Sequence, residues 1–216
     1  RVRGTLGSGA TGLQLGALVA SRDDLGGEAS GYNRSYGVDA NLAVSDKFLV
    51  HSYLALSDYP GREGNNRAGR VSAAFRDRLW DVSALFREVG DAFRPGMGFV
   101  ARSGIRHTYG TVGLHPRPAL PWVSEVNPYL EVDYITNLES ALETRAGTAG
   151  LGIAFLDGGQ LNATVAERLE VLDEPFLVAG QGEEVEAVVL REGQPAPQTF
   201  IATAGVSVDD EEATEA

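Results

Sequence analysis

Apolar and polar side chains alternate along Trp80-Asp81-Val82-Ser83-Ala84-Leu85-Phe86-Arg87. The four even-numbered residues share one face of an extended chain, because successive side chains of a β-strand point to opposite faces. Asp81, Ser83 and Arg87 share the other face. This period of two predicts a strand with one apolar wall and one polar wall. In a soluble sheet the polar wall faces water, whereas in a membrane barrel the apolar wall faces lipid and the polar wall lines the lumen.

The same alternation recurs through most of the chain. It predicts strands in residues 11–19, 36–44, 130–134, 151–155, 161–171 and 200–208. In residues 161–171 the apolar face is interrupted by Glu167. Residues 71–89 contain good helix formers, but their apolar spacing of two predicts a hairpin.

The connections between these strands alternate between short and long. Tight turns are predicted at Ser45-Asp46, Asp77-Arg78 and Asp157-Gly158-Gly159. Longer polar links are predicted at residues 21–33, 58–69, 90–104 and 173–184. Outer-membrane barrels have short turns at one end and long loops at the other. The Pro-rich residues 116–121 depart from this order, because they are long where a short turn is due.

Composition excludes several functional classes. The net charge of −12 argues against a nucleic-acid partner, which favours a basic surface. The chain has no cysteine, and His51, His107 and His115 are widely separated, so we expect neither a metal site nor a cofactor. No apolar run is long enough for a membrane-spanning helix, but barrel strands need only about 9–11 residues each.

Alternating strands also build soluble β-sandwiches and barrels. Three features favour a membrane barrel: apolar faces almost free of charge, small and charged residues on the opposite wall, and aromatic residues near strand ends. These aromatic residues are Tyr36, Trp80, Trp122 and Tyr134. We therefore expect an all-β, antiparallel up-and-down β-barrel of membrane type, with about 10–12 strands in this chain. Residues 1–208 would form part of a larger barrel, incomplete at the N-terminus, and residues 209–216 a disordered acidic tail.

Charged residues on the polar walls are candidates for contact with water or a ligand. They are Asp39, Asp81, Arg87, Glu131, Asp133, Arg168 and Glu170. We interpret most of these as cross-strand ion pairs, although rings of like charge could select ions. Glu131 and Asp133 share one face about 6–7 Å apart, loosely in the range of the paired carboxylates of glycoside hydrolysis. The simpler interpretation is that both keep the wall polar, so we expect no catalytic residues.

Residues 90–102 contain the pattern G-x-x-F-x-P-x-x-G-F-x-x-R, carried by Phe93, Pro95, Gly98, Phe99 and Arg102. With further matches at 33–39, at the Trp80 strand, and at 115–118 and 174–176, it resembles a family of uncharacterised bacterial outer-membrane β-barrels. The resemblance covers about residues 30–180 and implies that the barrel follows a carbohydrate-binding module of the family-nine type, which this chain lacks. It also implies surface glycan handling, without catalytic residues to carry over.

The segment around Phe93 falls in a long link. It would begin a type II turn with Pro95 second and Gly96 third, and it would dock Phe93 and Phe99 on the barrel or fold into the lumen. We expect a non-enzymatic protein in the outer membrane of a Gram-negative bacterium, with membrane lipid and a carbohydrate ligand as partners. The alternatives are a soluble, periplasmic or secreted β-sandwich that binds carbohydrate, and a glycoside hydrolase using Glu131 and Asp133.

Overall fold

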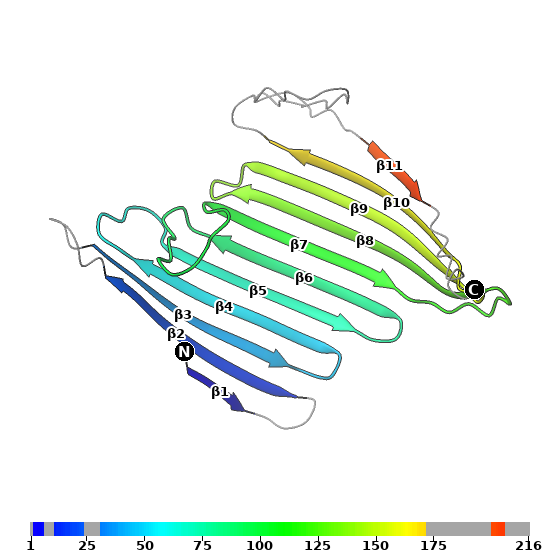
Figure 1. The fold of residues 1–216 in the computed structure, drawn as a ribbon, viewed down its shortest axis with the longest axis horizontal. Helices are drawn as coiled ribbons and strands as arrows, with labels where there is room; N and C mark the ends of the chain where they lie inside the picture. The colour runs from blue at the N-terminus through cyan, green and yellow to red at the C-terminus, as the bar shows by residue number, and fades with distance from the viewer. Residues whose placement is uncertain (1, 7–10, 24–30, 172–199, 206–216) are drawn as a thin grey trace, which may run out of the picture.

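A computed structural model describes residues 2–6, 11–23, 31–171 and 200–205. They form one antiparallel sheet in which every strand pairs with its neighbours in chain order (Figure 1). The strands are β1 (Val2–Leu6), β2 (Gly12–Asp23), β3 (Tyr32–Ala43), β4 (Phe48–Asp58), β5 (Arg67–Arg76), β6 (Trp80–Val89), β7 (Ile105–Leu114), β8 (Val123–Asn137), β9 (Leu142–Phe155), β10 (Gln160–Glu170) and β11 (Phe200–Gly205). The predicted all-β, up-and-down, antiparallel arrangement is confirmed.

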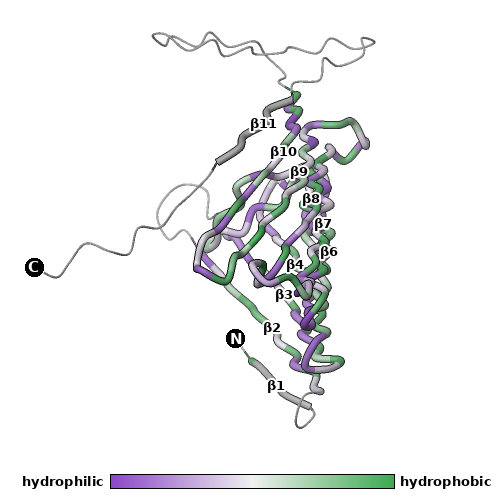
Figure 2. The backbone as a smooth tube through the Cα atoms, turned by 90° about the vertical axis from the view of Figure 1, so that its right-hand side faces the viewer, coloured by the Kyte–Doolittle hydropathy of each residue, from purple (hydrophilic) through white to green (hydrophobic). Residues whose placement is uncertain are grey.

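The sheet is open. β1 and β11 form its two edges, so the chain as described is not closed into a barrel. The sheet is nevertheless strongly curved, and Figure 2 shows β2 and β10 turning toward the same side of the central strands. None of the described segments is a helix long and apolar enough to cross a bilayer.

The two ends of the sheet differ in their connections. At one end, called the turn end here, the links are residues 44–47, 77–79, 115–122 and 156–159. The three predicted tight turns all lie there, together with the Pro-rich link. At the opposite end, called the loop end, the links include residues 59–66, 90–104 and 138–141. The last of these is short, so the expected alternation holds except at the β7–β8 and β8–β9 connections.

Local side-chain hydrogen bonds determine the tight turns. The Asp77 carboxylate accepts hydrogen bonds from the backbone N–H groups of Leu79 and Trp80, at 2.8 and 2.7 Å. These bonds, helped by the charges of Lys47 and Arg78, hold the pKa of the Asp77 carboxyl below its ordinary value. Their contribution to stability is therefore present above the ordinary carboxyl pKa and is lost as the pH falls through the depressed one.

The predicted strand bounds hold for the turn-end hairpin of residues 71–89, but several strands are longer than predicted. β3 begins at Tyr32 rather than at residue 36, β8 spans Val123–Asn137 rather than 130–134, and β9 begins at Leu142 rather than at residue 151. Residues 71–89 form the β5–β6 hairpin, as their period-two spacing predicts. β4 and β7 were not among the strands named from the alternation. The predicted link 173–184 and the acidic tail 209–216 lie outside the described residues.

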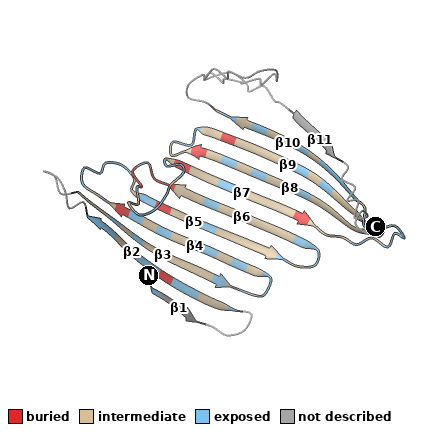
Figure 3. Cartoon of the chain, in the orientation of Figure 1, coloured by how far each residue is buried: buried red, intermediate tan, exposed pale blue. Residues whose placement is uncertain are grey.

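Few described residues are buried, and apart from Gly16 within β2 they gather near strand ends (Figure 3). The apolar cluster consists of Ala68, Val89, Phe93 and Ile105, each less than 9% exposed. Three of them come from β5, β6 and β7 at the loop end, and Phe93 comes from the segment between β6 and β7. The sheet therefore has no continuous apolar core along its length.

Candidate functional site

Strand register assigns every side chain to one of two faces. Asp39, Tyr53, Arg70, Arg87 and His107 oppose one another on successive strands and so share a face. Following the register from them places all seven charged residues expected on the polar walls on this same side, called the polar face: Asp39, Asp81, Arg87, Glu131, Asp133, Arg168 and Glu170. The alternate residues, among them Val38, Val82 and Val132, make up the apolar face.

The apolar face is exposed over its whole width. Val38 is 57% exposed, Leu54 67% and Val132 54%. The buried cluster at Ala68 and Val89 lies instead on the polar face, because these residues alternate with Gly69 and Glu88 of the apolar face. This distribution is the reverse of that in a soluble sheet, whose apolar face is packed against the core.

Aromatic side chains border the apolar face at both ends. Toward the loop end they are Tyr36, Phe86 and Tyr134, and toward the turn end they are Phe48, Phe75, Trp80 and Phe155. The Trp122 ring stacks on the Phe155 ring with centroids 5.9 Å apart, which adds a further aromatic residue to the turn-end border. As expected, Trp80 begins β6 and Trp122 directly precedes β8, whereas Tyr36 and Tyr134 lie four and three residues inside the loop-end limits of β3 and β8.

Charged residues appear on the apolar face only beyond the loop-end border. β8 carries no charged residue on this face. From the turn end, the first charges on the other strands from β2 to β10 are Asp23 on β2, Arg34 on β3, Asp58 on β4, Arg67 on β5, Glu88 on β6, Arg106 on β7, Arg145 on β9 and Glu167 on β10. Two cross-strand pairs form among them, Arg106 with Glu88 at 2.8 Å and Arg145 with Glu167 at 2.9 Å. Glu167, which interrupts the sequence alternation, thus belongs to this row of charges.

The row of first charges is slanted relative to the strands. Arg34 opposes Ser21, two residues before Asp23, and Glu88 opposes Gly69, two residues after Arg67. In each case the second charge along the chain lies two residues closer to the turn end than the first. The same displacement of two residues occurs between Asp58 and Arg67, between Arg106 and Arg145, and between Arg145 and Glu167. In five steps of two residues, the row therefore moves ten residues along the strands between β2 and β10.

The segment 90–104 folds over the polar face at the loop end, where Figure 1 shows it crossing the ends of neighbouring strands. Asn33 holds it with two hydrogen bonds, donating from Nδ2 to the Arg94 carbonyl and accepting from the Gly96 N–H, both at 2.8 Å. Ser57, which is fully buried, accepts a hydrogen bond from the Arg94 N–H at 2.9 Å. The Tyr59 hydroxyl donates to the Ala92 carbonyl at 2.9 Å.

The motif residues of this segment have different roles. Phe93 is 8% exposed and packs in the cluster, whereas Phe99 is 91% exposed, so the expectation that both dock is wrong for Phe99. The predicted type II turn is also wrong, because Gly96 lacks the positive φ that its third position requires. Instead the Gly98 N–H donates to the Pro95 carbonyl at 3.2 Å. Arg102 pairs with Glu143 at 2.6 Å and ties the end of the segment to β9.

Gly90 is where the chain leaves β6 to begin this segment. A Cβ atom there would collide with the carbonyl of Asn65, which is backbone and has little room to move. Gly90→Ala is therefore expected to lower the free energy of unfolding by about 1–3 kcal/mol. Chemical denaturation would measure the loss, with Gly147→Ala as the control, because a Cβ at Gly147 meets nothing within 4 Å. Equal stability of the two variants would contradict the close contact.

The central part of the polar face holds a hydrogen-bonded chain of Arg87, His107 and Asp133. Arg87 Nη2 donates to His107 Nδ1 at 3.3 Å, and His107 Nε2 lies 2.8 Å from Asp133 Oδ1. Arginine has no acceptor, so Nδ1 must be unprotonated and Nε2 must carry the proton given to Asp133. His107 is therefore neutral in this arrangement and separates the charge of Arg87 from that of Asp133.

Glu131 and Asp133 have separate partners on neighbouring β7. Tyr109 interacts with Glu131, and Asp133 accepts a hydrogen bond from His107. Each carboxylate thus has a neighbour on the adjacent strand, and that of Asp133 is a hydrogen-bonded imidazole. This pairing fits the interpretation of Glu131 and Asp133 as polar wall residues better than that of a free acid–base pair.

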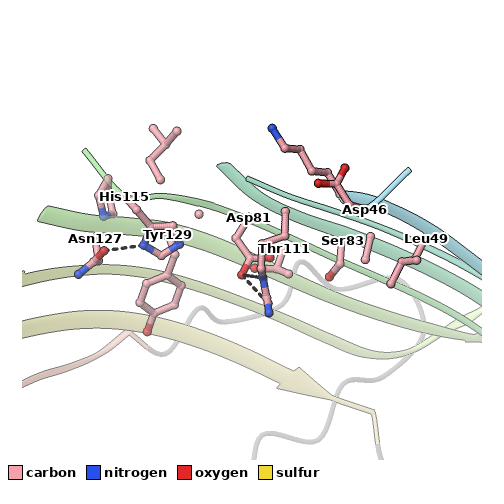
Figure 4. A pocket seen from close by; sticks show the side chains of 14 residues that line it. Asp46, Leu49, Asp81, Ser83, Thr111, His115, Asn127 and Tyr129 are labelled. Atoms are coloured by element: carbon pink, nitrogen blue, oxygen red, sulfur yellow. Dashed lines mark hydrogen bonds and ion pairs between the residues drawn. The ribbon is translucent and has the colours of Figure 1, made fainter. Parts of the chain in front are cut away.

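A hollow of about 560 Å³ lies on the polar face near the turn end (Figure 4). Asp81, one of the candidate residues, is on its wall and pairs with Arg76 at 2.6 Å. His115 Nδ1 lies 2.6 Å from Asn127 Oδ1 on the same wall. Of the remaining candidates, Arg168 and Glu170 are 3.5 Å apart on β10, and Asp39 lines a second hollow of about 390 Å³.

The polar face also brings together residues that the sequence analysis passed over. Tyr53 and Arg70 lie in one cross-strand row with Asp39 and Arg87, and Tyr109 contacts Glu131. The alternation in residues 68–76 places Arg70 with Ser72 and Arg76 on one wall, but only the register shows that it opposes Arg87. Over the described part of the chain, no three His, Asp or Glu side chains are placed to hold a metal ion.

Comparison with known proteins provides no further assignment: no family model, no curated protein and no solved structure matches this chain.

Proposed function

We propose that this chain is the membrane-spanning part of a non-enzymatic outer-membrane β-barrel of a Gram-negative bacterium, and that it passes or captures a ligand. The observation that carries the proposal is the exposed apolar face, free of charge between two aromatic borders on β2 to β10. Such a face costs free energy in water but is stabilised by hydrocarbon, and aromatic residues favour the two interfaces of a bilayer.

The slant of the charged row supports this proposal quantitatively. Ten residues correspond to about 33 Å along the strands, and the eight strand spacings from β2 to β10 to about 38 Å across them. The row is therefore inclined by about 40° to the perpendicular of the strands. Strands of membrane barrels tilt by about 35–45°, so a row inclined in this way would lie parallel to the membrane surface. In a soluble sheet, no bilayer surface would align the charges of this face along one inclined row.

The height of the uncharged zone is also that of a membrane. On β4, Phe48 at the turn-end border and Asp58 in the charged row are ten residues apart, about 33 Å along the strand. At a tilt of about 40° this length spans about 25 Å, which equals the apolar band of outer-membrane barrels.

The polar face would then line a water-filled passage that the segment 90–104 narrows at the loop end. Hydrogen bonds from Asn33 and Ser57 hold this segment against the wall. The resemblance to outer-membrane barrels that follow carbohydrate-binding modules favours a glycan as the ligand. In this arrangement, outer-membrane lipid surrounds the apolar face and the chain needs no cofactor.

Tryptophan fluorescence in vesicles tests the proposal, because the only two tryptophans, Trp80 and Trp122, both lie at the turn-end border. Quenchers attached near the lipid headgroup should reduce their emission more than quenchers at the ends of the acyl chains. Trp80→Phe and Trp122→Phe separate the two signals. Quenching by aqueous acrylamide, with none by either lipid-borne quencher, would show a water-soluble sheet and overturn the proposal.

A further inference from the structure

Two arginines face each other at the centre of the polar face. Arg70 on β5 is the register partner of Arg87 on β6, so their Cβ atoms are about 4.5–5.5 Å apart. Like charges placed directly opposite each other destabilise a sheet. Among the described residues no carboxylate lies within 4.0 Å of either guanidinium, although the chain as a whole carries a net charge of −12.

The surroundings leave this positive charge uncompensated. Arg87 directs Nη2 to neutral His107, and its Nε is buried without a hydrogen-bond partner in the structure. A buried guanidinium N–H without an acceptor costs free energy, so the described part of the chain does not compensate the charge of Arg87.

Space and further polar groups lie next to Arg70. The hollow of about 390 Å³ is lined by Arg70 together with Asn41, His51, Tyr53 and Ser72, and Asp39 lies at its β3 side. Hydroxyl, amide and imidazole groups of this kind hydrogen-bond to the hydroxyls of a sugar-like solute. The buried apolar cluster around Phe93 is next to the two arginines, because Ala68 is two residues from Arg70 on β5 and Val89 is two residues from Arg87 on β6.

We infer that Arg70 and Arg87 form a binding site for an oxyanion, a carboxylate or sulfate group carried by a hydroxylated solute. Guanidinium groups bind such anions through paired N–H···O bonds, and two of them opposite each other match one anion better than either does alone. The inference deepens the proposed function and rests on it in one respect, that the polar face is open to water and solute. It makes the passage selective for acidic ligands in spite of the negative net charge.

Binding to the full chain refolded in detergent tests the site, with glucuronate, sulfate and uncharged glucose as probes in titration calorimetry. Glucuronate and sulfate should bind, and glucose should not. Arg70→Ala and Arg87→Ala should each weaken binding at least about tenfold, the loss expected for a charge-assisted contact. Arg78→Ala, which removes the same charge from the turn 77–79, should bind as the parent does.

Stability without ligand gives an independent measurement. Removing Arg70 relieves the repulsion, so Arg70→Ala should unfold at the same denaturant concentration as the parent chain or at a higher one, and added sulfate should protect only the parent. Equal binding by Arg70→Ala and Arg78→Ala, or binding of none of the three probes, would overturn the inference. If the binding site is wrong, the probes fail to bind as predicted but the tryptophans are still quenched from within the lipid. If the membrane location is wrong, the lipid-borne quenchers have no effect on the tryptophans. The two proposals therefore fail in different measurements.

Discussion

Val82→Arg is expected to lower the free energy of unfolding in lipid by about 1–3 kcal/mol, because Val82 lies between the turn-end border, where an arginine costs little, and the middle of the lipid-facing band, where it costs most. Val82 lies on the apolar face of β6, between Trp80 of the turn-end border and Phe86 toward the loop end. It opposes Phe75 and Val112, so a guanidinium there has no polar partner on the neighbouring strands.

Ser83→Arg is the matched control, because Ser83 is the next residue of the same strand and faces the hollow near Asp81. The same side chain should cost about 0.5 kcal/mol or less there, as at an ordinary solvent-facing position. Urea denaturation in lipid vesicles measures both variants. If Ser83→Arg lost as much stability as Val82→Arg, or more, the assignment of the apolar face to lipid would be wrong.

Phe93→Ala is expected to lower the free energy of unfolding by about 3 kcal/mol, at the low end of the range for a buried phenylalanine. Phe93 is the side chain through which the segment 90–104 joins Ala68, Val89 and Ile105 of three different strands. Its loss leaves a cavity under the segment, whose other attachments include the hydrogen bonds to Asn33, Ser57 and Tyr59 and the ion pair of Arg102 with Glu143.

Phe99→Ala provides the control for this prediction, because Phe99 belongs to the same segment but is 91% exposed. We expect it to change stability by less than about 0.5 kcal/mol. Trypsin cleavage after Arg94 or Arg102 offers a second measurement, and it should accelerate in Phe93→Ala only. Equal cleavage of the two variants would mean that Phe93 does not hold the segment in place.

A strand is visible in the sequence when its apolar face carries large side chains and its other face does not. β4 was missed because Leu49, Tyr53 and Ala55 on its polar face hide the alternation. The alternation in residues 80–87 marks β6 because Trp80, Val82 and Phe86 are bulky. On β7 the same face carries Thr108 and Gly110, so its pattern is hidden. The first half of β9 was missed for the same reason, since Gly147 and Ala149 occupy its apolar face.

The candidate site was predictable as a face but not as a set of contacts. Period two is enough to place Asp39, Arg87 and Asp133 on one wall, because it depends only on the local chain. The chain from Arg87 through His107 to Asp133 depends on the register of three strands, and a shift of one residue would move each side chain to the other wall. For the same reason, the position of Arg70 opposite Arg87 could not be inferred from either strand alone.

The open edges of the sheet have a consequence for how it could close. In an up-and-down sheet the direction alternates from strand to strand, so β1 and β11, both odd-numbered, run the same way (Figure 1). Joining them would create a parallel seam in an otherwise antiparallel cylinder. Single-chain bacterial barrels avoid this by having an even number of strands. An antiparallel closure of this sheet therefore takes an odd number of additional strands, the smallest complete ring having twelve.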